Sequence, residues 1–520
     1  MNPRRVLLVA LLLFASLTYL WGVQRDLPHA PDSDEIDFLL IVAQMGASGD
    51  PNPHWFGHPG STFIYPFAIG LHGASAVSTG APWFRAHPEL ANYILENRGT
   101  SILIGRLVSV GYAVLALWLI CLVGDRAFGP PVGLIGGWFA VLSPLTFEHV
   151  DMARTDSAGL FFGFLATWAL LRLLSEPSRR AHVVAGLALG FAIGTRFFLA
   201  GLGPLLVVVE AVLLTRAHTQ AERTDVLRGG GIALACIAGG LILSSPFLFL
   251  EFGEVMKNLA HEARGAHPGA DGLDFAGNLS WYFTTALPRS VPWPLLVLSA
   301  AGGVLALVRR EVEPLLLLGF VVIFLGGISL ATLHWGRWLI QILPTFALLA
   351  ASALVFAVQW AVRRAGAGAR AGQIALLVSV VAVSAVPAWN YVAFAGLQAT
   401  SSTREIARDW ILANLSPTER IAADLYTAPL SESPFEDTDF VFSLGEVAGH
   451  PAELRARGYD IAMVSSAVYR RFFATPKRYP AEIGFYRALF RKTELLKEFR
   501  PGPGGRGPVI RLYRLPDALP

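Results

Sequence analysis

Cysteine and charged residues are both scarce in this 520-residue sequence. Its two cysteines, Cys121 and Cys236, lie inside apolar runs, so neither a disulfide framework nor a zinc site can be inferred from them. Only 15% of the residues are charged, whereas 54% are hydrophobic, and the mean hydropathy is +0.51. This composition excludes an ordinary soluble domain and is typical of an integral membrane protein.

An excess of basic charge is also lacking. The formal net charge is +3, and the basic residues are scattered between apolar runs rather than gathered into a stripe. We therefore expect no nucleic-acid partner. No Gly-rich phosphate loop, paired metal ligands or nucleophile elbow is present in the polar tail, so the tail is expected to have an accessory role.

The sequence contains many long apolar runs. The first, after Arg4 and Arg5, is expected to be a retained membrane anchor rather than a cleaved signal peptide, because no small-x-small cleavage site follows it. Further runs are close to the length that a bilayer of about 30 Å requires. These runs are 101–123, 131–147, 157–174, 183–215, 230–250, 291–308, 315–333, 338–362 and 373–395.

The run 183–215 is too long for one upright span, since a single helix would extend about 50 Å. It contains Gly201, Gly203 and Pro204, which favour a break. If the chain reverses near Arg196, the basic loops that follow lie on the cytoplasmic side, where Lys and Arg are preferred. We therefore expect about 11 spans in a mostly α, polytopic membrane bundle, with the N-terminus cytoplasmic.

The expected organisation has two parts. Residues 1–395 form the transmembrane domain, with a first outer loop over 24–100. Residues 396–520 form a small α/β domain on the outer side, because short β-branched runs alternate there with a segment of helical periodicity.

Carboxylates are concentrated in two segments that we expect to lie at the outer face of the membrane. The stretch "PDSDEIDF" at 31–38 has four acids in eight residues, and helix capping by Ser33 or Asp34 accounts for only part of them. The stretch "EHVDMARTD" at 148–156 places Asp151 and Asp156 where two spans meet. Ionisable groups so close to hydrocarbon are costly unless they face a wet cavity or a partner, and Arg154 is one available structural partner.

Two arginines and two histidines are also expected at the outer face of the membrane. Arg196 and Arg337 lie at outer helix ends, where an arginine can reach lipid headgroups or bind a phosphate through its guanidinium fork. His54 and His58 occur in a loop rich in Pro, Gly and aromatics, without a companion pair at metal-ligand spacing. Carboxylates beside cations are the groups needed to deprotonate a hydroxyl and to stabilise a departing phosphate.

The ordered series of these segments resembles the polyprenol-phosphate-dependent membrane glycosyltransferases of the C type, in the bacterial branch related to protein O-mannosyltransferases. The resemblance runs nearly end to end. It rests on the acidic pair followed by Gly-Asp-x-Asn-Pro-His-aromatic-aromatic, the second acidic loop, the segment around Arg196, the stretch "HWGRWLIQILP", and the beginning of the tail. Gly60 departs from the His-Pro-Pro form of the eukaryotic branch, which weakens the case for a protein acceptor.

The resemblance implies roles for individual residues. Asp34 would be the catalytic base, with Glu35 beside it, and Asp156 would take the place of the acid in the second outer loop. Arg337, Arg196, His58 and Asp151 would bind the lipid phosphate or the donor. The implied reaction inverts the anomeric carbon and requires no metal or other cofactor, although Glu35 or Asp156 could hold a divalent cation.

The same resemblance implies partners and a location. The donor would be a sugar on a polyprenyl phosphate, and the acceptor a glycan, lipid or protein at the outer face of a bacterial inner membrane. The sequence leaves the sugar and the acceptor open. A transporter or flippase of lipid-linked sugars is the alternative, and a membrane scaffold is a weaker one; polar residues gathered on one face, without an inverted repeat, favour the transferase.

Overall fold

The computed structural model describes residues 3–30, 32–79, 88–262, 267–431, 433–435 and 437–516. The chain divides into two compact units. The first unit comprises Met1–Val23, Asp34–Ala263 and Asp274–Val392, and the second comprises Gln24–Ser33, Arg264–Leu273 and Ala393–Pro520.

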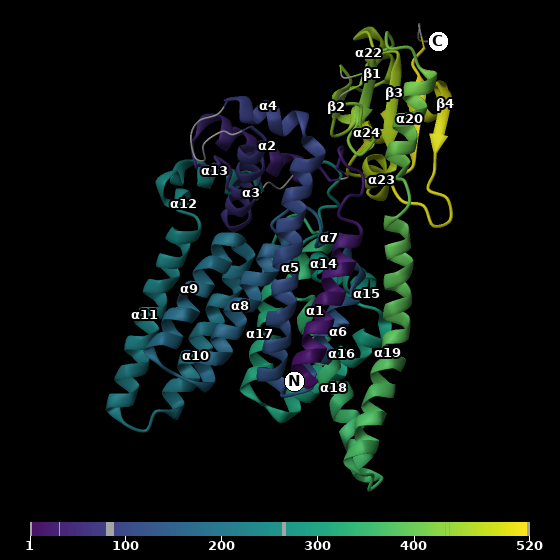
Figure 1. The fold of residues 1–520 in the computed structure, drawn as a ribbon. Helices are drawn as coiled ribbons and strands as arrows, with labels where there is room; N and C mark the ends of the chain where they lie inside the picture. Colours follow the sequence, from purple (N-terminus) through teal and green to yellow (C-terminus); the bar gives the residue numbers. More distant parts are fainter. Residues whose placement is uncertain are drawn as a thin grey trace. The chain divides into compact units, whose positions relative to one another are not determined.

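The first unit is a helical bundle (Figure 1). Its α-helices are α1 (Pro3–Trp21), α2 (Ser33–Ser48), α3 (Ser61–Thr79), α4 (Pro88–Glu96), α5 (Arg98–Phe128), α6 (Val132–Val141), α7 (Pro144–His149), α8 (Asp156–Ser175), α9 (Arg179–Thr195), α10 (Gly203–Arg216), α11 (Gln220–Ser244), α12 (Phe247–Leu250), α13 (Phe252–Glu262), α14 (Phe275–Trp281), α15 (Leu287–Ser290), α16 (Trp293–Arg309), α17 (Val312–Ser329), α18 (Leu343–Arg364) and α19 (Ala369–Gln398). Two 3-10 helices, η1 (Phe197–Leu202) and η3 (Gly336–Gln341), and a π-helix, η2 (Tyr282–Ala286), complete it.

Many of these helices are built to lie in lipid. Within the described residues, eight helical segments are long and apolar enough to cross a membrane: α1, α5, α8, η1 with α10, α11, α17, α18 and α19. Helices α6 and α16 are apolar but shorter. The predicted fold class, a mostly α polytopic bundle with a small C-terminal sheet, is therefore confirmed, while the number of 11 spans stays a prediction.

The predicted break near Arg196 is also confirmed. Helix α9 ends at Thr195, Arg196 adopts an extended backbone, and η1 leads into α10. Pro204 lies in the first turn of α10, where a missing N–H costs nothing because the first helical amides have no intrahelical acceptor.

One expectation about helix extent is wrong. The run 131–147 is not one helix: Ser143 separates α6 from α7 and accepts a hydrogen bond from the Thr146 amide at 3.4 Å, and Pro144 cannot donate to the preceding turn. The segment 24–100, expected as the first outer loop, contains the helices α2, α3, α4 and the start of α5.

Small residues bring helices of the bundle into close contact. A Cβ atom on Gly186 of α9 would lie 2.3 Å from the Ala233 carbonyl oxygen of α11, and one on Gly190 would lie 2.4 Å from the Ile237 carbonyl oxygen. Both distances are far below van der Waals contact, so only glycine permits this approach. Such small-residue contacts are how membrane helices gain packing energy without a hydrophobic driving force.

The second unit contains a five-stranded sheet with strand order β2-β1-β3-β5-β4. Strand β1 pairs in parallel with β2 and β3, whereas β5 pairs antiparallel with β3 and β4. The remaining elements are helices. The bounds are α20 (Thr403–Asn414), β1 (Ile421–Asp424), β2 (Asp439–Val441), α21 (Leu444–Val447), α22 (Pro451–Ala456), β3 (Ile461–Ser465), α23 (Ser466–Ala474), α24 (Pro480–Lys492), β4 (Glu494–Phe499) and β5 (Ile510–Arg514).

Strand β3 shows how the sheet forms two cores. Ala462 and Val464 pack with residues of α23 and α24, whereas Ile461 and Met463 pack with residues of α20. Side chains alternate across a strand with a period of two, so one short strand supplies both faces. The helix and the β-branched runs predicted in the tail correspond to α20, β1, β3 and β5.

Candidate functional site

Most of the predicted acids and arginines lie at the ends of helical elements of the first unit. Asp34 is in the first turn of α2, and Asp156 is the first residue of α8. Arg196 lies between α9 and η1, and Arg337 belongs to η3. Helix N-termini carry partial positive charge, which favours the ionised form of both carboxylates.

Asp34 and Arg337 form the accessible part of the site. The Arg337 Nη1 atom donates to Asp34 Oδ2 at 2.7 Å, and Arg154 Nη1 lies 3.8 Å from the same oxygen. The Asp34 and Arg337 side chains are 33% and 27% exposed, so both can meet a ligand.

Beneath this pair lies a buried set of charges. Arg196 donates through Nη1 to Asp156 Oδ1, and Arg154 Nη2 lies 3.2 Å from Asp156 Oδ2. The three side chains are at most 3% exposed. Gln341 donates through Nε2 to the Asp156 carbonyl oxygen at 3.1 Å, which ties η3 to the beginning of α8.

We call Asp34, Arg154, Asp156, Arg196 and Arg337 the arginine–aspartate cluster. Three guanidinium groups face two carboxylates, which leaves one positive charge in excess. A buried charge is tolerated only with partners, and here Arg154 is shared between both acids. The cluster is thus suited to an anion, and only its Asp34–Arg337 side is open to one.

Charge and burial fix the protonation of Asp34 and His58, which both lie outside the candidate spans. Burial raises the pKa of Asp34, but the nearby guanidinium groups of Arg337 and Arg154 outweigh it and hold that pKa below its usual value. Withdrawal of the His58 ring from water, followed by repulsion from Arg196, lowers its pKa to about 3. At neutral pH the carboxylate is ionised and the imidazole is neutral.

His58 is held beside the cluster by its neighbours. Its Nδ1 atom lies 3.3 Å from the Thr155 hydroxyl oxygen, and its ring contacts those of Trp55 and Phe38 at centroid distances of 4.6 and 5.8 Å. Phe38 is one turn after Asp34 on α2, so the same helix positions the carboxylate and supports the imidazole.

Glu35 does not join the cluster. Its Oε1 atom accepts hydrogen bonds from Arg106 Nε and from the Ala153 amide, and its Oε2 atom accepts one from Arg106 Nη2, each at 2.8 Å. Arg106 also donates to the Val23 carbonyl oxygen at 2.8 Å. Both side chains are fully buried, so Glu35 holds α2, α5 and the turn before α8 together.

Asp151 is buried in the turn between α7 and α8. Three residues at or near the site were assigned no active role from the sequence: Arg154, Arg106 and Gln341. A lone arginine in the apolar run 101–123 was a usable signal for a buried partner, since such a charge is costly in hydrocarbon.

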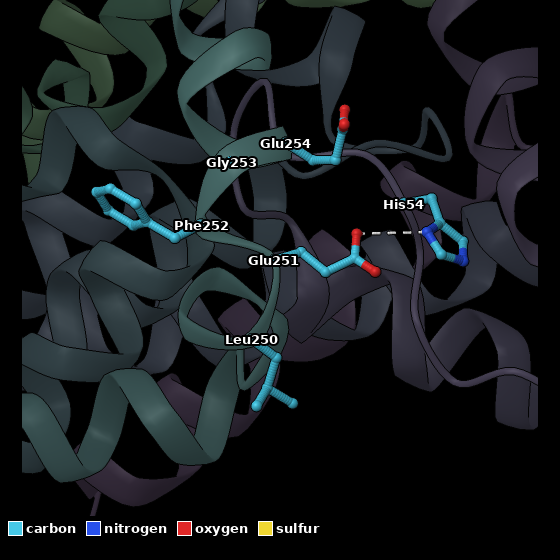
Figure 2. Close-up of a pocket in the computed structure, with 6 residues that line it drawn as sticks. All are labelled: His54, Leu250, Glu251, Phe252, Gly253 and Glu254. Atoms are coloured by element: carbon cyan, nitrogen blue, oxygen red, sulfur yellow. Dashed lines mark ion pairs between the residues drawn. The ribbon is translucent and has the colours of Figure 1, made fainter.

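A separate open cavity of about 600 Å³ is lined by His54, Leu250, Glu251, Phe252, Gly253 and Glu254. Figure 2 shows the Glu251 carboxylate directed toward the His54 ring, with a Nδ1 to Oε2 distance of 3.4 Å, whereas Leu250 and Phe252 point away from it. None of the predicted site residues lines this cavity.

Metal-ligating side chains do not gather in the part of the chain that the structure describes: no three His, Cys, Asp or Glu residues there are placed to hold one ion. Asp34 and Asp156, the carboxylates of the cluster, are each paired with arginine. Metal independence of the reaction stays a prediction.

Part of the chain matches a family model. Residues 80–242 match the model described as dolichyl-phosphate-mannose-protein mannosyltransferase. This segment contains Arg154, Asp156 and Arg196, but neither Asp34 nor Arg337. None of the curated proteins matches the sequence significantly.

The fold is similar to that of several solved structures. ArnT from Cupriavidus metallidurans in the apo state has a TM-score of 0.53 and 15% identity, with 98% of this chain and 97% of that chain covered. ArnT bound to undecaprenyl phosphate gives 0.52 and 14%, with the same coverage. The oligosaccharyltransferase AglB from Archaeoglobus fulgidus, in complex with an inhibitory peptide and a dolichol-phosphate, gives 0.50 and 13%, with 94% and 72% covered.

At these identities the structural similarity shows the fold. Together with the family match it confirms the resemblance to polyprenol-phosphate-dependent membrane glycosyltransferases of the C type.

Proposed function

We propose that the protein transfers a sugar from a polyprenyl-phosphate carrier to an acceptor hydroxyl. The observation that carries the proposal is the arginine–aspartate cluster, which has one excess positive charge and an accessible carboxylate beside an accessible guanidinium. Support comes from solved relatives of the same fold, since ArnT is seen with undecaprenyl phosphate and AglB with a dolichol-phosphate.

The reaction is a single displacement. The acceptor oxygen attacks the anomeric carbon and gives its proton to Asp34, while the bond from that carbon to the phosphate oxygen breaks. The departing polyprenyl phosphate keeps the electron pair and is stabilised by Arg337, whose planar fork suits a phosphate. The anomeric configuration is inverted.

The buried residues act through their neighbours. Asp156 orients Arg196 and Arg154, and these keep the base of the site positive, so Asp156 is a positioning residue rather than one that touches the sugar. Arg196 contributes to phosphate binding through its charge. Neutral His58 has one ring N–H, which can donate to a phosphate oxygen, and one bare ring nitrogen, which can accept from a hydroxyl. A donor-binding role for Asp151 stays a prediction.

The proposal also includes the membrane location of the active site, the kind of acceptor and the absence of a metal requirement. The active site faces the outer side of a bacterial inner membrane, the N-terminus is cytoplasmic, and the tail lies outside. The acceptor is a glycan, lipid or protein hydroxyl. No divalent cation is required, because guanidinium groups supply the charge that a metal would otherwise provide.

Purified protein in lipid vesicles tests the proposal with a panel of polyprenyl-phosphate sugars and a membrane extract that supplies acceptors. Release of free polyprenyl phosphate, with the sugar transferred in inverted configuration, is expected for at least one donor. A transporter would instead move labelled lipid across the vesicle wall without releasing the phosphate, and that result would contradict the proposal.

A further inference from the structure

The two accessible residues of the cluster are engaged with each other. Arg337 Nη1 donates to Asp34 Oδ2 at 2.7 Å. In this arrangement the guanidinium donor that would bind a phosphate is occupied by the carboxylate, and the carboxylate that would accept a proton is stabilised in its ionised form. Neither group is therefore in its most active state.

Exposure separates this ion pair from the rest of the cluster. Asp34 and Arg337 are 33% and 27% exposed, whereas Arg154, Asp156 and Arg196 are at most 3% exposed. An arriving anion meets Arg337 before it meets any buried arginine. A partly exposed ion pair is weak, so the phosphodiester of the donor, whose two non-bridging oxygens match the guanidinium fork, can compete with one carboxylate for Arg337.

Arg154 is a second positive charge near the Asp34 carboxylate when that carboxylate leaves Arg337. Arg154 Nη1 lies 3.8 Å from Asp34 Oδ2, beyond a hydrogen bond but close enough to attract the charge. Arg154 is itself held by Asp156 at 3.2 Å. Asp34 can thus leave Arg337 without becoming an uncompensated charge, and it keeps a weaker countercharge that leaves it more basic.

We propose that the donor phosphate displaces Asp34 from Arg337, so that the base is released for proton transfer only when a donor occupies the site. The inference rests on the proposed function and adds the order of events: phosphate binding comes first and activates the carboxylate. Asp34 then has two roles, as the base and as an internal competitor that holds the phosphate site closed to weaker anions.

This exchange has an unusual consequence. Removing the charge of Asp34 abolishes the base but leaves Arg337 without its internal competitor. The Asp34→Asn protein should therefore bind sugar-free polyprenyl phosphate more tightly than the wild type, by about threefold or more, the size expected for a partly exposed ion pair. A carboxylate that did not compete for Arg337 would give only the smaller gain that comes from removing its general repulsion of the phosphate.

The test measures binding of sugar-free polyprenyl phosphate to full-length protein in nanodiscs. Asp50→Asn is the matched control: Asp50 is an acid of the loop after α2, 44% exposed, and it interacts with His54 rather than with the cluster. Its affinity should stay within about twofold of the wild type. Arg337→Gln should weaken binding about tenfold or more, because a charge-assisted hydrogen bond is lost. Asp34→Ser provides a second neutral variant should the amide disturb folding.

Three results would overturn the inference. Equal or weaker binding by both Asp34 variants, with Arg337→Gln still impaired, would show that Arg337 binds phosphate without competition, and the proposed function would survive. A similar gain in the affinity of Asp50→Asn for polyprenyl phosphate would show that general electrostatics, rather than competition for Arg337, causes the gain in Asp34→Asn. An absence of binding in every protein, including the wild type, would remove the lipid-phosphate site and count against the proposed function as well.

Discussion

The structure gives Glu35 a different role from the one that the sequence suggested. The resemblance places Glu35 in catalysis, whereas in the structure it is fully buried and both of its oxygens are used by Arg106 and the Ala153 amide. In Glu35→Gln, one oxygen is replaced by an amide that points hydrogens at a guanidinium donor. The substitution also leaves the Arg106 charge buried without a counterion.

Removing one member of a buried ion pair costs about 3–5 kcal/mol. Glutamine keeps the shape of the side chain and one acceptor, so we expect the lower end, about 3 kcal/mol. That loss should lower the unfolding midpoint by about 3 °C for a chain of this length. Because the cluster itself is untouched, the rate of transfer per folded molecule should change little.

The assay compares thermal unfolding and transfer rate for Glu35→Gln, the wild type and Asp50→Asn in one detergent. The double variant Glu35→Leu with Arg106→Leu should recover much of the lost stability, since a buried ion pair can often be replaced by apolar side chains. A Glu35→Gln protein as stable as the wild type but inactive would refute the reasoning and return Glu35 to the chemistry.

Substitutions at three other residues test other parts of the account. Arg337→Gln should raise the donor KM about tenfold or more in steady-state transfer assays, with Arg337→Lys in between, because lysine keeps the charge but not the fork. Since the pKa of folded His58 is about 3 against about 6.5 unfolded, the unfolded chain gains its proton first as the pH falls. Wild type should therefore lose stability relative to His58→Gln between pH 7 and pH 5, measured by the unfolding midpoints at both. Burial raises the pKa of Asp424 to about 7, and its two oxygens accept from the Leu444 and Ser465 amides. Asp424→Asn should cost about 1–3 kcal/mol, seen as faster proteolysis within residues 403–516 of the full-length protein. The wild type should lose stability as the pH rises from about 4 through 7, and the Asn variant should not.

Hydropathy predicted the membrane bundle because helix length and apolar composition are local properties. The break at Arg196 was predicted instead from the length of the run 183–215, its Gly and Pro residues, and the preference of basic loops for the cytoplasmic side. Hydropathy missed the division of 131–147, because Leu142 and Leu145 flank Ser143 and Pro144 and keep that window apolar. In the tail, β1, β3 and β5 were evident from buried apolar runs. Strands β2 and β4 were not, because their exposed residues weaken the hydrophobic pattern.

The site was only partly predictable for a different reason. The sequence identified acids and arginines at helix ends, but the pairings join residues far apart in the chain, such as Arg337 with Asp34. Arg154 looked like a structural partner for one of the acids in 148–156, and nothing in the sequence indicated that it also faces Asp34. Arg106 gave a signal by its isolation in an apolar run, but its partner Glu35 could be found only from the fold.

The central claim is that Asp34 accepts the proton of the acceptor hydroxyl during sugar transfer. The most direct test is the single-turnover rate of polyprenyl-phosphate release by wild type and Asp34→Asn, with donor binding measured on the same samples. The account predicts that Asp34→Asn binds the donor but transfers sugar at least about 100-fold more slowly, the usual contribution of a general base. A variant that binds the donor and releases polyprenyl phosphate at the wild-type rate would contradict it.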